Sequence, residues 1–176
     1  VCMSEADHDV ALEDTDRVQG HTALVRNVAA AVALSGAVRS TLGPRGMDKM
    51  LVDDSGEVVV TNDGVTVLET AKVEHPTANL LIATSSAQDR DARDGTTTTV
   101  ILMAEMLQNA LELVRSGVHP TIIVKGFQIA NEEAITELNR LARTPKNDTE
   151  RRAVVSTSLA GKIDTKIVQH LADLAI

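Results

Sequence analysis

The stretch Asp94-Gly95-Thr96-Thr97-Thr98-Thr99 opens a long apolar segment and is the sharpest local signal in the chain. A helix that begins here presents unpaired backbone amides and a partial positive charge at its first turn. Glycine lets the backbone approach an anion closely, threonine hydroxyls donate further hydrogen bonds, and Asp94 can hold a Mg²⁺ that neutralises a phosphate. The same residues also fit an Asp N-cap followed by threonines of indifferent helix propensity. Phosphate binding and simple capping therefore both remain open, and no Gly-Lys-Ser/Thr follows to make this a Walker A loop.

Apolar residues three or four positions apart predict long helices on both sides of this stretch. Before it, a helix is expected from Arg17, with Gly43 as its left-handed cap and Pro44 as its stop. After it, one helix runs to Gly117 and His119-Pro120 opens another. The residues expected on the buried faces of these three helices are Leu24, Val28, Ala31, Ser35, Val38 and Leu42, then Val100, Met103, Leu107, Ala110 and Val114, then Ile123, Phe127, Ala130, Ala134, Leu138 and Leu141.

Shorter helices complete the pattern. One passes through Val67-Leu68, and one runs from His75-Pro76 to about Asp91. Another follows Asn147, whose side chain is expected to form a capping box with Glu150. The apolar face of a last helix is expected to carry Ile163, Ile167, Leu171 and Leu174.

Two short β-branched runs flank a turn between the first two helices. Met50-Leu51-Val52 and Val58-Val59-Val60-Thr61 lie on either side of Asp53-Asp54-Ser55-Gly56, which is the pattern of a β-hairpin. A lone hairpin is marginally stable in water, so its edges are expected to pair with another strand. The predicted fold class is mainly α: a helical bundle with one protruding hairpin.

The composition limits the classes of function. The chain has one Phe and no Trp or Tyr in 176 residues, so its core must be aliphatic. Base recognition by aromatic stacking is disfavoured, and the net charge of −8 also argues against a nucleic-acid partner. Adaptation to a salt-rich cytosol and an ordinary acidic surface explain this charge equally well.

The remaining global features indicate a cytoplasmic protein. One cysteine excludes a disulfide framework, and no apolar run is expected to reach the roughly 18 residues that a membrane span needs. Residues 1–16 are rich in acids and carry no signal-peptide pattern, so they are expected to form a flexible acidic arm. We therefore expect no membrane partner.

Two further motifs are ambiguous when taken alone. Thr41-Leu42-Gly43-Pro44-Arg45-Gly46 fits a helix stop and a turn. Thr61-Asn62-Asp63-Gly64 fits a turn as well, although an Asp that faces a phosphate there could polarise a water or help to hold a metal.

In their order and spacing, these motifs resemble the archaeal group II chaperonins of the thermosome/TCP-1 family. The segment from Thr41 to Leu51 resembles the chaperonin signature, with Met47-Asp48-Lys49-Met50 as its group II form. The resemblance runs from about Arg17 to the end of the chain. The other motifs that carry it are Val60-Thr61-Asn62-Asp63-Gly64-Val65-Thr66-Val67-Leu68, Glu74-His75-Pro76, Asp94-Gly95-Thr96-Thr97-Thr98, Gly117-Val118-His119-Pro120 and Thr157-Ser158-Leu159-Ala160-Gly161-Lys162.

The resemblance implies a domain organisation. Residues 17–145 would form the N-terminal half of the equatorial ATP-binding domain, and residues 146–176 the start of the intermediate domain. The apical domain, which binds unfolded client proteins, would be absent. So would the returning intermediate Asp that activates water and the Gly-rich loop that completes the pocket.

The resemblance also implies a site for ATP or ADP with Mg²⁺. Asp63 matches the acidic residue that faces the γ-phosphate and supports hydrolysis, and Asp94 matches the Mg²⁺ ligand. Lys162 matches a lysine that senses the γ-phosphate. The implied nucleotide contacts are the backbone of Leu42, Gly43 and Pro44, and Gly95, Thr96, Thr97 and Thr98 around the phosphates. The implied partners are other chaperonin subunits, in a homo- or hetero-oligomeric double ring where the hairpin joins a sheet partly supplied by a neighbour.

Two positions depart from the family pattern. Arg93 stands where the family has Gly before the Asp, and Arg45 stands where Lys is usual. If position 93 needs a positive φ, Arg carries a strain of about 1 kcal/mol or more. Its guanidinium could instead reach a phosphate, so both consequences stay open.

Three functions remain open for the chain. It can be a piece of an ATP-driven folding chaperone, with weak or no ATP turnover of its own. It can be a truncated, non-enzymatic paralogue that pairs with intact chaperonin subunits through its hairpin. It can also be a decayed gene product without a stable fold.

Overall fold

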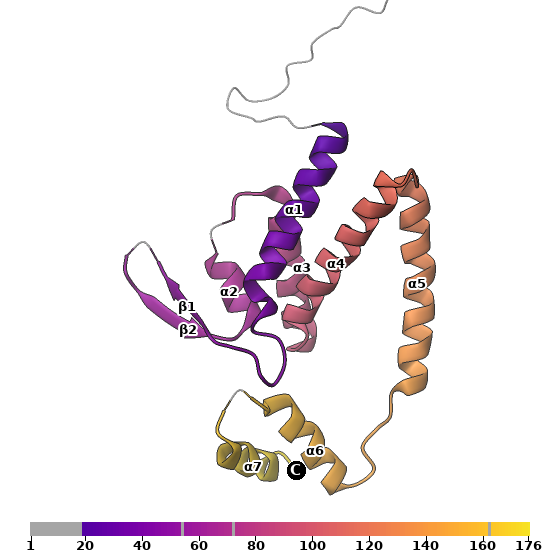
Figure 1. The fold of residues 1–176 in the computed structure, drawn as a ribbon. Coiled ribbons are helices and arrows are strands. Elements are labelled where there is room, and N and C mark those ends of the chain that lie inside the picture. The colour runs from indigo at the N-terminus through magenta and orange to yellow at the C-terminus, as the bar shows by residue number, and fades with distance from the viewer. Residues whose placement is uncertain (1–18, 54, 72, 162) are drawn as a thin grey trace, which may run out of the picture.

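The computed structural model describes residues 19–53, 55–71, 73–161 and 163–176. In these ranges a helical bundle carries one projecting hairpin, as the sequence predicted. The elements in chain order are α1 (Gly20–Arg39), β1 (Lys49–Val52), β2 (Val58–Thr61), α2 (Gly64–Thr70), α3 (Pro76–Ala92), α4 (Thr96–Arg115), α5 (Pro120–Leu141), α6 (Asp148–Leu159) and α7 (Thr165–Leu174). Figure 1 shows α1 to α4 packed together, the hairpin at one side, and α6 with α7 beneath them.

The core lies where α1 to α4 meet, and it is aliphatic throughout. Small side chains at Ala31, Ala78 and Ala104 are at most 2% exposed, which lets the helices approach closely. Larger side chains fill the space between them, and each contributes about 1.5–3 kcal/mol when fully buried. The remaining core residues are Leu34, Val38, Val67, Leu68, Leu81 and Val100. This core fixes the loops at one end of the bundle, where the candidate site lies.

Helix α1 ends earlier than the sequence predicted. Its last residue is Arg39 and its C-cap is Ser40, whose backbone is right-handed, so Gly43 is not the cap. The end is closed by Thr41, because its N–H and its hydroxyl both donate to the Val38 carbonyl, at 3.0 and 2.8 Å. Gly43 does have a positive φ of 82°, but in the turn that follows.

The expectation that no apolar run reaches the length of a membrane span does not hold for helix α1. It is 20 residues long, and its length and mean hydropathy alone would allow it to cross a membrane. Its face of Val28, Ala31, Leu34 and Val38 is instead buried in the core with α3 and α4. A core helix meets the same two criteria, so they carry no argument for a membrane span.

The hairpin has the predicted strands and one exposed apolar face. Strands β1 and β2 are antiparallel, with Met50 opposite Val60 and Val52 opposite Val58. These four side chains are between 54 and 69% exposed. The opposite face is half-buried, and α2 packs near it.

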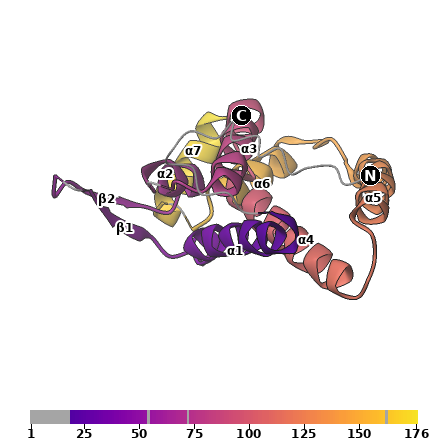
Figure 2. The same ribbon diagram turned by 90° about the horizontal axis from the view of Figure 1, so that it is seen from above.

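Helices α5 and α7 do not bury most of the residues that their apolar patterns predicted. Along α5 only Ile123 is buried, and Leu138 is 65% exposed, because α5 meets α4 near one end and then diverges from it (Figures 1 and 2). In α7 the buried residues are Val168 and Ala172, each one position after a predicted one, because this is the face that packs on α6.

The predicted cap of α6 is present. The Asn147 side-chain oxygen accepts the Glu150 N–H at 2.9 Å. The reciprocal bond of the capping box shifts by one residue, since the Glu150 carboxylate accepts the N–H of Lys146 at 2.8 Å.

Candidate functional site

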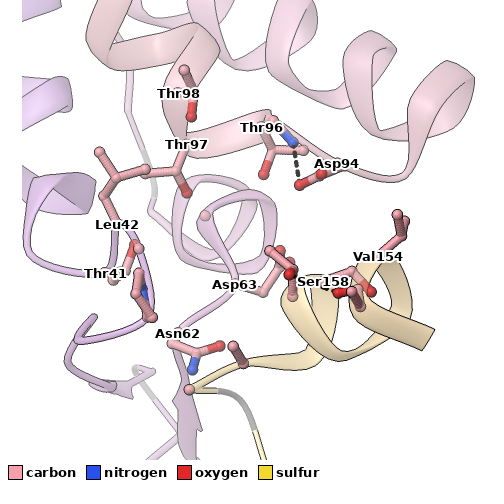
Figure 3. Close-up of a pocket in the computed structure, with 18 of the residues that line it drawn as sticks. Thr41, Leu42, Asn62, Asp63, Asp94, Thr96, Thr97, Thr98, Val154 and Ser158 are labelled. Carbon is pink, nitrogen blue, oxygen red and sulfur yellow. Dashed lines mark hydrogen bonds between the residues drawn. The ribbon is translucent and has the colours of Figure 1, made fainter. Parts of the chain in front are cut away.

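The start of α4 is a helix N-terminus without a side-chain cap. Its N-cap residue is Gly95, in a left-handed conformation with φ 79°. Asp94 does not cap the helix, because its Oδ1 accepts only the adjacent Gly95 N–H, at 2.8 Å (dashed line in Figure 3). The capping interpretation of this stretch is therefore wrong. No described side chain accepts from the first-turn amides of α4, which remain available to an anion.

The four threonines of this turn differ in their hydrogen bonds and in whether they line the cavity. The Thr99 hydroxyl donates to the Gly95 carbonyl at 2.9 Å and lies outside the site. Thr96 is buried, and its carbonyl accepts the Ser85 hydroxyl at 3.2 Å, which fixes the turn to α3. Thr97 is half-buried and Thr98 is exposed. The side chains of Thr96, Thr97 and Thr98 face one cavity (Figure 3).

Asp63 serves as the N-cap of α2. Its Oδ2 accepts the Thr66 N–H at 3.0 Å and the Thr66 hydroxyl at 2.8 Å. Its Oδ1 has no hydrogen-bond partner in the described ranges, and the carboxylate lines the cavity. The motif therefore ends β2 and caps α2, and it leaves one oxygen of Asp63 free for a ligand.

Close contacts at Gly64 and Gly161 join separate walls of the cavity, and a third, at Gly46, closes the loop after α1 on itself. A Cβ at Gly64 would overlap the Thr97 hydroxyl, so the starts of α2 and α4 nearly touch. A Cβ at Gly161 would overlap the Pro44 carbonyl, which joins the loop after α6 to the loop after α1. Gly46 lies in the same way against the carbonyl of Thr41. At Gly46 and Gly161 the nearest atom is a backbone carbonyl oxygen, so only glycine permits the approach there.

These elements surround a cavity of about 880 Å³. All predicted site residues that the structure describes line it; Lys162 lies outside the described residues. They come from three separate segments, which are Leu42, Gly43 and Pro44, then Asp63, then Asp94, Gly95, Thr96, Thr97 and Thr98.

The carboxylates suit a metal shared with a ligand. The described residues hold no cluster of three or more His, Cys, Asp or Glu side chains that could bind a metal alone. Asp94 is exposed to the cavity, and Asp63 lines the same cavity. Mg²⁺ is commonly bound by one or two carboxylates together with phosphates and waters, so these residues fit that ion.

Comparison with known proteins identifies the family. Residues 34–176 match the model of the TCP-1/cpn60 chaperonin family, which is most of the chain. The chain belongs to this family. Its chaperonin relatives include thermosome subunit alpha of Thermoplasma acidophilum, 44% identical over 95% of this chain, and thermosome subunit 2 of Haloferax volcanii, 43% identical over 93%.

The chaperonin fold is matched as well. A crystal structure of a group III chaperonin in the open state superposes with a TM-score of 0.75 and 35% identity, over 88% of this chain and 31% of that one. The chain spans 31% and 30% of the two thermosome subunits. It therefore corresponds to about a third of its chaperonin relatives.

Arg93, which stands where the family has Gly, adopts a left-handed backbone conformation. Its φ of 55° and ψ of 21° make it the one non-glycine residue with positive φ in the described part of this chaperonin chain. Its guanidinium pairs with Asp89 at 3.3 Å, and Arg93 does not line the cavity. The backbone strain is thus present, while the contact to the cavity is not.

Sequence reasoning missed the wall that α6 contributes. Ala153, Val154, Thr157 and Ser158 line the cavity and lie three or four positions apart. This face of the helix mixes two apolar residues with two hydroxyl side chains, so the sequence offered no apolar stripe that would point to it. In the structure Val154 is 58% exposed. In Figure 3, Val154 and Ser158 of this chaperonin chain stand across the cavity from Thr97.

Proposed function

We propose that the cavity binds Mg-ATP and, after hydrolysis, ADP, as part of a cytoplasmic chaperonin subunit that drives the folding of unfolded proteins. The observation that carries the proposal is the meeting of residues 42–44, 63 and 94–98 around one cavity, at an uncapped helix N-terminus. A long helix start with free amides is a favourable place for phosphate oxygens.

Each wall has a role in this proposal. The amides and hydroxyls of residues 95–98 donate to phosphate oxygens, and the backbone of residues 42–44 lies along the nucleotide. Asp94 ligates Mg²⁺, which neutralises phosphate charge when bound. Asp63 keeps α2 in place with Oδ2 and directs Oδ1 toward the γ-phosphate, where it orients the attacking water. Lys162, which lies outside the described residues, is assigned the role of sensing the γ-phosphate because of its motif alone.

The domain assignment belongs to the proposal. Residues 17–145 form half of the equatorial domain and residues 146–176 begin the intermediate domain, while the predicted acidic arm of residues 1–16 lies outside the described residues. The chain spans about a third of its relatives. We therefore assign hydrolysis, client binding and ring formation to the intact subunit, and expect nucleotide binding with little turnover from these 176 residues.

Calorimetric titration with Mg-ATP tests the proposal. The wild-type chain should bind, and Asp94→Ala should weaken binding at least about tenfold, because a charged ligand of the metal is lost. Asp91→Ala is the matched control, since Asp91 is exposed on α3 and does not line the cavity. No binding by the wild type, or equal binding by Asp94→Ala, would contradict the site.

A second candidate function rests on the hairpin. Its exposed face of Met50, Val52, Val58 and Val60 has no partner in the described part of the chain. Exposed apolar strands are sites of pairing with other chains. On this view the chain is a non-enzymatic partner of intact chaperonin subunits. Co-purification with such subunits that Val60→Lys abolishes would support it, and a monomer that ignores them would exclude it.

A further inference from the structure

Resting on the proposed function, we infer that Arg143 binds the polyphosphate of the ligand and sets the affinity of this site for anions. No motif in the sequence pointed to this residue. It lies in the linker between α5 and α6, which runs on the side of the molecule opposite the hairpin (Figure 1). Its position among the cavity-lining residues is the starting observation.

The charge of the cavity calls for a cation. Its described lining carries three carboxylates, from Asp63, Asp94 and Glu150, against the one guanidinium of Arg143. The described wall therefore has a formal charge of −2, which opposes a polyphosphate. The uncapped amides of α4 offset only a part of it, because a helix N-terminus is equivalent to roughly half a positive charge.

Arg143 is also free to act on a ligand. It has no ion pair or hydrogen bond with any residue in the described ranges, whereas Arg140 pairs with Glu137 and Arg151 with Asp148. Glu150, the acid of the same wall, is engaged because it accepts the N–H of Lys146. A guanidinium with free donors binds phosphate oxygens in a bidentate manner, which a bare ammonium cannot do.

Isothermal titration with Mg-ATP and Mg-ADP tests the inference on the full chain. Arg143→Gln should bind both nucleotides about three- to tenfold more weakly, since the side chain is exposed and its charge is partly screened. Added salt should weaken the wild type more than this variant, because one charge contact is gone. Arg143→Lys should recover part of the affinity.

Lys146→Gln is the matched control. It removes the same charge from the same linker, but Lys146 does not line the cavity. Equal affinity of wild type and Arg143→Gln, or an equal loss in Lys146→Gln, would overturn the inference while leaving the proposed function intact. If Asp94→Ala lost binding while Arg143→Gln kept it, the inference would likewise be overturned and the proposed function would stand. A wild-type chain that binds no nucleotide would overturn both.

Discussion

Gly64 lies so close to Thr97 that no side chain fits between them: a Cβ at Gly64 would stand 3.2 Å from the Thr97 Cβ and overlap its hydroxyl. This contact places the start of α2, with its cap Asp63, against the first turn of α4. The geometry of the cavity therefore depends on the absence of one methyl group.

Gly64→Ala should lower the free energy of unfolding by about 1–3 kcal/mol, because overpacking forces α2 away from α4. Gly36→Ala is the control, since Gly36 is helical, exposed and has no atom within 4 Å of an added Cβ. It should raise stability by about 0.5–1 kcal/mol. Thermal unfolding measures both. Equal changes in the free energy of unfolding for the two variants would contradict the close contact between Gly64 and Thr97. A non-cooperative melt of the wild type would favour a decayed gene product.

Gly161→Ala should weaken Mg-ATP binding while leaving the melting temperature of the α1–α4 core nearly unchanged. The added Cβ would meet the Pro44 carbonyl and separate two walls of the cavity. Gly117→Ala controls for backbone strain, since Gly117 also has a positive φ but no atom within 4 Å of an added Cβ. Calorimetry should show a loss for the first variant alone, and equal losses would assign the effect to strain elsewhere.

Arg93→Gly should raise the free energy of unfolding by about 1 kcal/mol, since glycine adopts φ 55° without strain. The ion pair with Asp89 that it removes is exposed and contributes little. Arg90→Gly, three positions earlier in α3, should have the opposite sign and cost about 1 kcal/mol. Chemical denaturation compares the two variants; a destabilised Arg93→Gly would mean that the side chain matters more than the backbone.

The hairpin turn should loosen in acid. The Ser55 hydroxyl, and after it the Glu57 amide, hold the pKa of the Asp53 carboxyl below its usual 3.8. Because the folded-state pKa is depressed, the stabilisation is complete above pH 3.8 and is lost as the pH falls through the lower folded value. Nuclear magnetic resonance titration of the Ser55 and Glu57 amides should show a midpoint below 3.8 that Asp53→Asn removes. A midpoint at or above 3.8 would contradict this.

The sequence predicted local features well where local chemistry determines them. The hairpin, the start of α3 and the cap at Asn147 are each specified by neighbouring residues, and all are present. The end of α1 was misplaced because hydrogen bonds from Thr41 close the helix before the expected Gly43. Sequence rules place the end of a helix at a nearby glycine, and they do not detect a hydrogen bond that closes the helix earlier.

The site was predicted in part, and the rest depended on packing. Asp63 and residues 94–98 lie in motifs that are ambiguous when taken alone, and they were selected because those motifs together resemble the chaperonin family. The contribution of Ser158 and Arg143 depends on how α6 and its linker lie against the bundle, which no local pattern encodes. The unburied face of α5 has the same cause, because a sequence shows an apolar stripe but not what covers it.

The contact between Pro44 and Gly161 has a consequence for the order of folding. The α1–α4 core lies within residues 20–115, whereas this contact joins position 44 to position 161 and so closes a longer loop that contains nearly all the other elements. Closing so long a loop costs entropy that few contacts repay until the core exists. The cavity should therefore be completed last, so that nucleotide binding would report the final step of folding rather than the first.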